Sequence, residues 1–243
     1  MRKTLALFAL LLGSATAGAQ TINAAGDPWP PFLDPNHPQQ GVAIELVREA
    51  LATQGHQLNF SFVPWQRALD GVKEAEYDVL VSAWKTQERE TFLEFNDAYL
   101  HNDIKFIKAK GTPFEYAGLD SLNGKTVGTV RGYGYGDAFE KASNFKRDEA
   151  ANLMPSILKL IGGRIDLTLE DELVAKSLIS KENPALLEQI EFVATPLSSN
   201  GLHVAAGLKN PKHAEIIAAF NKGLQTIKAN GTFDEVLQRN GVK

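Results

Sequence analysis

The chain has 243 residues, of which 44% are hydrophobic and 22% are charged. These ordinary globular values exclude a disordered or fibrous chain. Its 25 basic and 29 acidic residues give a net charge of -4, which argues against nucleic-acid binding because phosphate contacts need a cationic face. The chain has no cysteine and only five scattered histidines, which excludes disulfides and thiolate catalysis and argues against a metal site. We therefore expect no cofactor and no metal.

The first residues have the pattern of a secretion signal. Arg2 and Lys3 precede an apolar stretch over residues 5–12 and small residues over 13–19, which predicts a signal peptide over 1–19 cleaved after Ala19. Because no cysteine stands at this junction, we expect no lipid anchor. No later stretch reaches the roughly 20 apolar residues of a spanning helix, so we expect a free, soluble protein outside the cytoplasm.

The first half of the mature chain alternates predicted strands and helices. Strands are predicted over residues 22–25, 58–62 and 78–82, and helices over 42–51 and 68–72, the first of them ended by Gly55. The helices follow from apolar spacings of three and four, and the strands from alternating or continuous apolar runs. This order predicts parallel strands joined by helical crossovers.

A second α/β unit begins near the turn at residues 121–124. Strands are predicted over 126–130 and 165–169, and helices from Asp137, over 154–161 and over 173–179. The tail predicts a helix after Pro211 ended by Gly231, then a short helix with a capping box of Thr232 and Glu235.

The tryptophans suggest where a ligand binds. Trp29, Trp65 and Trp84 each lie in a loop that follows one of the first three predicted strands, and ligands of open parallel sheets bind beyond the carboxyl ends of the strands. The alternative is ordinary core packing, the usual role of an aromatic residue. Three such placements favour at least two of the rings as walls of one crevice.

Charged residues at two strand exits remain ambiguous from pattern alone. Arg89 suits a carboxylate because its planar donors reach both oxygens, but the spacing alone favours the alternative of a helix-surface arginine paired with a neighbouring glutamate. Glu170 and Asp171 follow the strand over 165–169. They either hold an ammonium group or lie in the first turn of a helix, where the dipole favours acids.

A glycine-rich loop separates a predicted strand from a helix. Gly132, Gly134 and Gly136 alternate with Tyr133 and Tyr135. The third glycine of a dinucleotide fingerprint is missing, so the loop is interpreted as an anion- or carboxylate-binding turn, with a plain tight turn as the alternative.

At these residues the sequence resembles the extracellular solute-binding proteins of family 3, the periplasmic amino-acid receptors of ABC importers, over essentially the whole mature chain. The matching pieces are residues 29–32, Gly41, Tyr77 with Asp78, the T-x-x-R element of Thr86 and Arg89 with Phe95 and Tyr99, residues 122–128, residues 163–166 with Asp171, and residues 230–232.

The resemblance implies an α/β, two-lobed periplasmic binding protein of type II, in which each lobe is a mostly parallel sheet flanked by helices. Two hinge strands would join lobe 1, residues 20–106 plus 204–243, to lobe 2, residues 107–203. It also implies a monomer that binds an amino acid by cleft closure and delivers it to an inner-membrane ABC permease.

Residue roles follow from the same resemblance. Arg89 matches the residue that grips the α-carboxylate, Asp171 the one that takes the α-ammonium and Ser82 a cleft hydrogen-bonder, while Trp29 is the aromatic lid and Trp65 a side-chain wall. Trp84 and Gly134 depart from the usual small polar residues, and Tyr133 or backbone amides would substitute. Arg67 is either a second anion contact or a solvated helix residue.

Two other functions stay open. One is a small dehydratase or lyase on the same scaffold, which needs a cleft acid with a near-neutral pKa, either Glu170 or Asp171. The other is a soluble sensor that docks on a membrane receptor in place of a permease.

Overall fold

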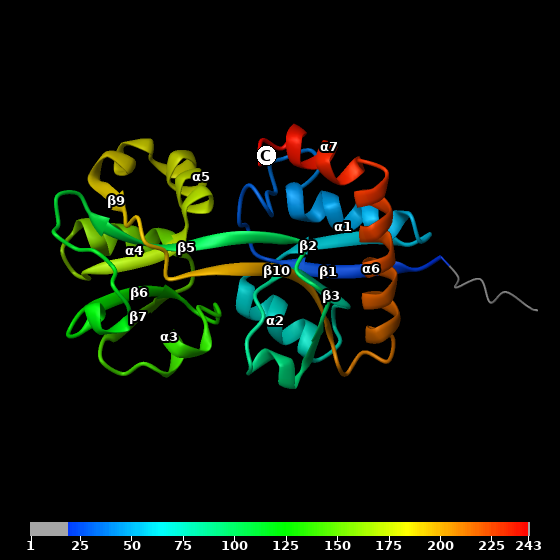
Figure 1. Cartoon of the computed structure of the whole chain (residues 1–243), viewed down its shortest axis with the longest axis horizontal. Helices are drawn as coiled ribbons and strands as arrows, with labels where there is room; N and C mark the ends of the chain where they lie inside the picture. The colour runs from blue at the N-terminus through cyan, green and yellow to red at the C-terminus, as the bar shows by residue number, and fades with distance from the viewer. Residues whose placement is uncertain (1–18, 243) are drawn as a thin grey trace, which may run out of the picture.

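The computed structural model describes residues 19–242 and shows two lobes joined by two long strands that run side by side between them (Figure 1). These are β5 (Leu100–Ala109) and β10 (Ser198–Gly207), paired antiparallel with Ser198 opposite Ile104 and Leu202 opposite Leu100. The fold is the expected type II arrangement of two α/β lobes and two hinge strands. The expected signal peptide lies, except for Ala19, outside the described residues.

Lobe 1 is built from both ends of the described chain. Its strands are β1 (Thr21–Gly26), β2 (Gln57–Phe62), β3 (Val79–Ala83) and β4 (Leu93–Phe95), and its helices are α1 (Val42–Ala52), α2 (Trp65–Lys73), α6 (His213–Ala229) and α7 (Thr232–Arg239). Strand β1 lies parallel between β2 and β3. All five residues of β3 are buried, as the continuous apolar run predicted. Helices α1 and α2 lie on opposite faces of this sheet (Figure 1).

Lobe 2 repeats the plan with a contiguous piece of chain. It contains β6 (Thr126–Val130), β7 (Lys146–Ala150), β8 (Leu167–Asp171) and β9 (Ile190–Phe192), with helices α3 (Asp137–Lys141), α4 (Leu153–Ile161) and α5 (Glu172–Glu182). Strand β6 pairs parallel with β7 and β8. Every main strand and helix expected for both lobes is present.

The sheet is continuous across the molecule, with strand order β2-β1-β3-β10-β5-β8-β6-β7. The proposed lobe boundaries after residues 106 and 203 both fall inside the crossing strands, β5 and β10. One buried hydrophobic cluster includes Ile22 and Val79 of lobe 1 as well as Val127 and Leu167 of lobe 2. The two lobes are therefore packed together as well as covalently linked.

Two local expectations are wrong. The predicted capping box fails because Gly231, with φ +87°, is the N-cap of α7, and Thr232 is already the first helical residue with no side-chain cap bond. Strand β8 begins at Leu167 and extends through Asp171, so Glu170 and Asp171 end the strand itself. Helix α5 starts only at Glu172.

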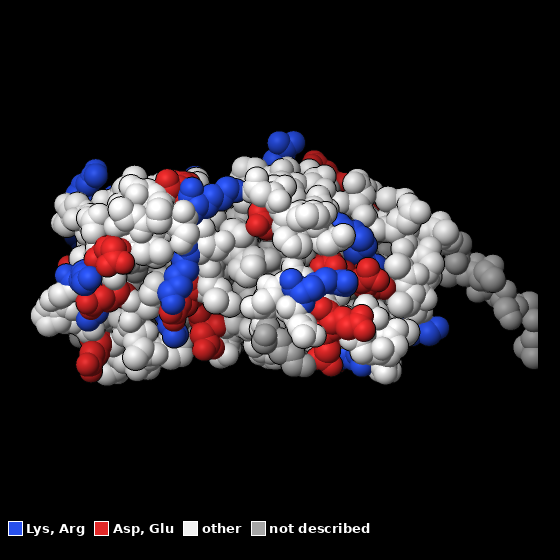
Figure 2. Space-filling view, turned by 90° about the horizontal axis from the view of Figure 1, so that it is seen from above, with Lys and Arg blue, Asp and Glu red and all other residues white. Residues whose placement is uncertain are grey.

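On the face seen in Figure 2, acidic and basic side chains intermingle over both lobes, and neither sign forms a continuous patch. Within residues 19–242, no helix combines the length and the apolarity needed to cross a membrane.

Candidate functional site

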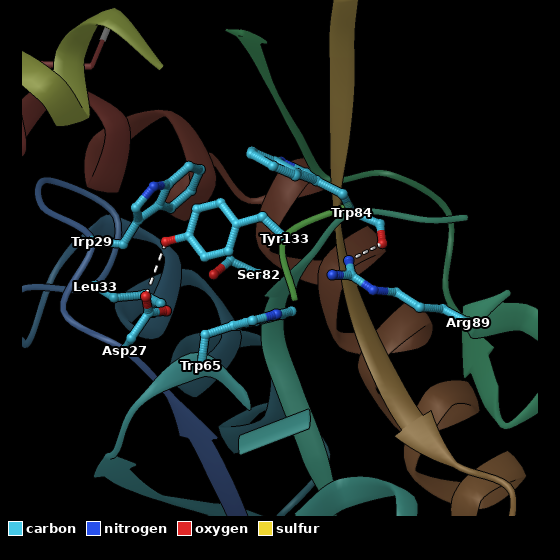
Figure 3. A pocket seen from close by; sticks show the side chains of 8 residues that line it. All are labelled: Asp27, Trp29, Leu33, Trp65, Ser82, Trp84, Arg89 and Tyr133. Carbon is cyan, nitrogen blue, oxygen red and sulfur yellow. Dashed lines mark hydrogen bonds between the residues drawn. The ribbon is translucent and has the colours of Figure 1, made fainter. Parts of the chain in front are cut away.

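A small cavity lies where the two lobes meet. Eight residues line it, namely Asp27, Trp29, Leu33, Trp65, Ser82, Trp84, Arg89 and Tyr133 (Figure 3). All three tryptophans converge there, as their positions at strand exits predicted. Seven of the eight residues come from lobe 1, and Tyr133 reaches in from lobe 2.

The parallel strands of lobe 1 place these side chains. Asp27 and Trp29 follow β1, Trp65 opens α2 after β2, and Ser82 and Trp84 lie at the end of β3. Because β1, β2 and β3 are parallel, their carboxyl ends meet at one edge of the sheet. The cavity is formed at this edge.

The rings of the cavity pack edge to face. The centroid of Trp84 is 5.8 Å from that of Trp29 and 5.5 Å from that of Tyr133, with interplanar angles of 78° and 83°. Trp65 meets Tyr133 at 5.9 Å and 82°. This geometry places the positive edge of one ring against the negative face of another.

Each indole N–H also has an acceptor. Trp29 Nε1 donates to Glu170 Oε1 at 3.1 Å, Trp65 Nε1 to the carbonyl of Gly132 at 2.7 Å, and Trp84 Nε1 to Asn102 Oδ1 at 3.1 Å. The first two bonds cross from lobe 1 to lobe 2. The tryptophans therefore wall the cavity and also hold the lobes together.

Arg89 lies in the interior, in the short 3₁₀ segment Arg89–Thr91, with only 4% of its surface exposed. This excludes the alternative of a surface arginine. Its Nη1 donates to the carbonyl of Trp84 and its Nη2 to that of Gly132, both at 2.7 Å. Burial lowers the pKa of Arg89 to about 10, so the guanidinium is charged at neutral pH.

The glycine-rich loop of lobe 2 lies directly against this guanidinium. A Cβ atom added at Gly134 would stand 2.7 Å from Thr86 Cγ2 and 3.2 Å from Arg89 Cζ. Gly132 has φ +74°, a backbone conformation that other residues rarely adopt. The two glycines therefore let the loop approach lobe 1 closely.

Asp171, which lies opposite Ile104 of β5 and lines neither this cavity nor a second, larger cavity, caps a helix. Its Oδ1 accepts from the backbone N–H groups of Leu173 at 2.8 Å and Val174 at 3.0 Å, at the start of α5. Burial raises the pKa of Asp171, and these two backbone bonds oppose the rise. The residue is 4% exposed, so its carboxyl group is held inside the molecule rather than turned to bulk water.

Glu170 is the acid that meets lobe 1. It is 1% exposed, and its Oε1 accepts from Trp29 Nε1 and from the backbone N–H of Asp171 at 2.9 Å. Burial raises the pKa of Glu170 to about 8, and the nearby carboxyl groups of Asp171 and Asp27 add to the rise.

Asp27 is a cavity residue that the sequence analysis missed. Its Oδ2 accepts from the hydroxyl of Tyr133 across the cleft at 2.9 Å, and burial raises the pKa of Asp27 to about 6. Its position after the first strand, two residues before Trp29, could have predicted Asp27 as a residue of the same crevice.

The remaining predicted site residues differ in position. Ser82 and Tyr133 line the cavity. Arg67 is exposed on α2 and does not line it. Arg67 also lies outside the second, larger cavity, whose lining includes Thr86 and Arg89. Across residues 19–242, no group of three or more histidine and acidic side chains is placed to hold a metal ion.

Comparison with known proteins identifies the family. The model of the bacterial extracellular solute-binding proteins, family 3, matches residues 22–242. The chain belongs to this family. It is 26% identical to the lysine/arginine/ornithine-binding periplasmic protein of Escherichia coli K12, over 98% of this chain and 96% of that protein.

Solved structures show the same fold. An ancestral arginine-binding protein bound to arginine superposes with a TM-score of 0.75 at 22% identity, covering 90% of this chain and 97% of the other. A histidine kinase sensor domain with similarity to periplasmic binding proteins gives 0.77 at 20% identity, covering 90% and 95%.

Proposed function

We propose that this member of the family binds an amino acid in the cleft between its lobes and delivers it to an ABC importer. The supporting observation is that lobe 1 buries a cationic side chain and lobe 2 buries two acidic ones. Arg89 of lobe 1 presents a guanidinium, and Glu170 and Asp171 of lobe 2 present carboxyl groups. An α-amino acid carries the complementary carboxylate and ammonium.

In this proposal Arg89 binds the ligand's α-carboxylate beside the backbone of Gly134, and Asp171 binds the α-ammonium. Charge-assisted hydrogen bonds contribute roughly 1.5–3 kcal/mol each, while micromolar binding requires about 8 kcal/mol. The hydrogen bonds of the two charged groups therefore contribute less than the binding free energy that micromolar affinity requires. Burial against Trp29, Trp65 and Trp84 supplies the remainder, and Ser82 adds a hydrogen bond.

The family and its curated relatives support the transport role. The relative from Escherichia coli is named as a periplasmic amino-acid-binding protein. We propose that residues 1–19 direct export, that the mature protein works in the periplasm as a monomer, and that an inner-membrane permease receives the ligand. The lobe boundaries at 20–106 with 204–243 and at 107–203 remain part of this proposal.

Isothermal titration calorimetry with a panel of L-amino acids tests the binding role. We expect one class of amino acid to bind the wild type, and Arg89→Lys to bind it at least tenfold more weakly, because lysine keeps the charge but loses the planar fork. Arg164→Ala, which removes an exposed arginine of lobe 2, serves as the matched control. Equal affinity in wild type and Arg89→Lys would remove the carboxylate role.

One observation favours a second function, an enzyme on the same scaffold. Glu170 has a raised pKa of about 8, near the value that a general acid or base needs at neutral pH. The relatives are binding proteins, and we propose that this chain also performs no catalysis. Product formation from a bound compound, lost in Glu170→Gln while binding persists, would support the enzyme instead.

A further inference from the structure

A segment of lobe 2, residues 132–134, enters the lobe 1 half of the binding site. The carbonyl of Gly132 accepts from Trp65 Nε1 and from Arg89 Nη2, both at 2.7 Å. The next residue, Tyr133, donates its hydroxyl to Asp27 Oδ2 at 2.9 Å. Three lobe 1 side chains thus bind two adjacent residues of lobe 2.

The ring of Tyr133 lies among the indoles that wall the cavity. It meets Trp65 at 5.9 Å and Trp84 at 5.5 Å, in both cases nearly perpendicular. In Figure 3 the ring stands between these tryptophans and Trp29, with its hydroxyl directed to Asp27. A flat side chain with a donor at its far end therefore occupies this part of the site.

The contacts of this segment reproduce the parts of an aromatic amino acid. A carbonyl oxygen meets the guanidinium that we assign to the ligand's carboxylate, a ring fills the indole-walled space, and a hydroxyl reaches a carboxylate at the end. We propose that residues 132–133 act as a built-in surrogate ligand, and that the true ligand is an aromatic amino acid whose ring carries a hydrogen-bond donor. This rests on the proposed function above.

The chemistry of the walls favours such a ring over other side chains. Asp27 accepts the Tyr133 hydroxyl inside the closed cleft, and a ligand without a donor would leave this carboxyl group unpaired, which costs binding energy. A basic side chain would offer donors, but the Arg89 guanidinium already lies 5.0 Å from the centroid of Trp65. The face of Trp65 is therefore already engaged by one cation, and a neutral ring brings no second cation to it.

Ligand and surrogate compete for the same groups, so they exclude each other. The contacts of residues 132–133 hold the lobes closed, and a ligand binds only after they separate. The apparent affinity is then reduced by the fraction of molecules in which the surrogate occupies the site. Weakening the surrogate without altering lobe 1 should therefore strengthen ligand binding.

Calorimetric titrations with L-tyrosine, L-phenylalanine, L-arginine and L-alanine test the proposal on the wild type, Tyr133→Phe, Asp27→Asn and the control Tyr116→Phe. Tyr116 of lobe 2 packs on Phe106 of the crossing strand β5 and does not line the cavity. We expect the wild type to bind L-tyrosine at least tenfold more tightly than the other three.

The variants should test the surrogate role of Tyr133 separately from the preference for a ligand ring that carries a donor. Tyr133→Phe loses the bond to Asp27 and should bind L-tyrosine about tenfold more tightly, in line with one hydrogen bond to a charged group. Asp27→Asn should lose the preference for L-tyrosine over L-phenylalanine, and Tyr116→Phe should match the wild type. Circular dichroism verifies that each variant is folded.

Three results would overturn the proposal. If L-arginine or L-alanine binds as tightly as L-tyrosine, the aromatic ligand class is wrong, although the amino-acid-binding role stands. If Tyr133→Phe binds L-tyrosine more weakly or equally, Tyr133 is a wall of the loaded site and not a surrogate. If the wild type binds no amino acid at all, the proposed function itself fails.

Discussion

Replacing Glu170 with glutamine should remove a pH dependence of stability that the wild type shows between pH 6 and 8. The carboxyl group is buried, with a pKa of about 8 against an ordinary value of 4.5. The folded protein therefore keeps a proton that the unfolded chain has released over this range. A raised acid pKa stabilises the fold fully below pH 4.5, and this contribution is lost as the pH rises to 8.

The magnitude follows from the two pKa values. Their difference of about 3.5 corresponds to about 5 kcal/mol over the whole range, of which about 2 kcal/mol falls between pH 6 and 8. Asp27, with a pKa of about 6 against 3.8, loses its own contribution mostly below this window. Glutamine stays neutral and keeps an oxygen that accepts from Trp29 and from the backbone N–H of Asp171.

Urea denaturation followed by tryptophan fluorescence, at intervals from pH 6 to 8, measures the effect. The wild type should lose about 2 kcal/mol more than Glu170→Gln across the interval. Glu172→Gln is the matched control, because Lys105 and Lys176 lower the pKa of that carboxyl group, so it is ionised throughout. Parallel pH profiles for wild type and Glu170→Gln would refute the reasoning.

Substitutions centred on three further positions test the site and the packing. Gly134→Ala should lower the melting temperature of the ligand-free protein, because in the closed cleft the added Cβ meets Thr86 Cγ2 at 2.7 Å. Adding Thr86→Ser, which removes that methyl group, should restore part of the stability in thermal melts, and no restoration would contradict the steric cause. Asp171→Ser and Asp171→Ala should both lose ligand affinity. Asp171→Ser should keep the melting temperature of the wild type because serine also caps helices, whereas Asp171→Ala should lose about 1 kcal/mol of stability. Equal melting temperatures for the two variants would disprove the capping role. Gly223→Ala should cost about 2 kcal/mol, because its Cβ would lie 2.0 Å from the Ala50 carbonyl oxygen, and thermal melts that match those of Lys222→Ala, an exposed position on the same helix, would count against it.

The helices and strands could be predicted from the sequence because each follows from a pattern of neighbouring residues. The continuous apolar run of β3 and the spacing of three and four in α1 are visible in neighbouring residues, and both elements formed as predicted. The capping box failed for a local reason as well, since Gly231 takes the cap position with a left-handed backbone and Thr232 enters the helix. Motif spacing alone did not reveal which residue begins the helix.

The site was predictable only as far as strand exits determine it. The convergence of Trp29, Trp65 and Trp84 follows from parallel strands, which local patterns indicate. The bond of Tyr133 to Asp27 joins loops of different lobes, and it depends on how the lobes close, which no short pattern encodes. Glu170 escaped a firm assignment because the end of β8 decides which of two adjacent acids faces Trp29.

The path of the chain sets the order in which the molecule is assembled. Lobe 2, from β6 to β9, is one uninterrupted stretch, whereas β3 of lobe 1 takes as its sheet neighbour β10, and α1 packs against α6, both from the far end of the chain. Such distant partners slow folding because a long loop must close before they meet. During synthesis, the half that holds Arg89 and the tryptophans is thus completed last, when the final helices become available to it.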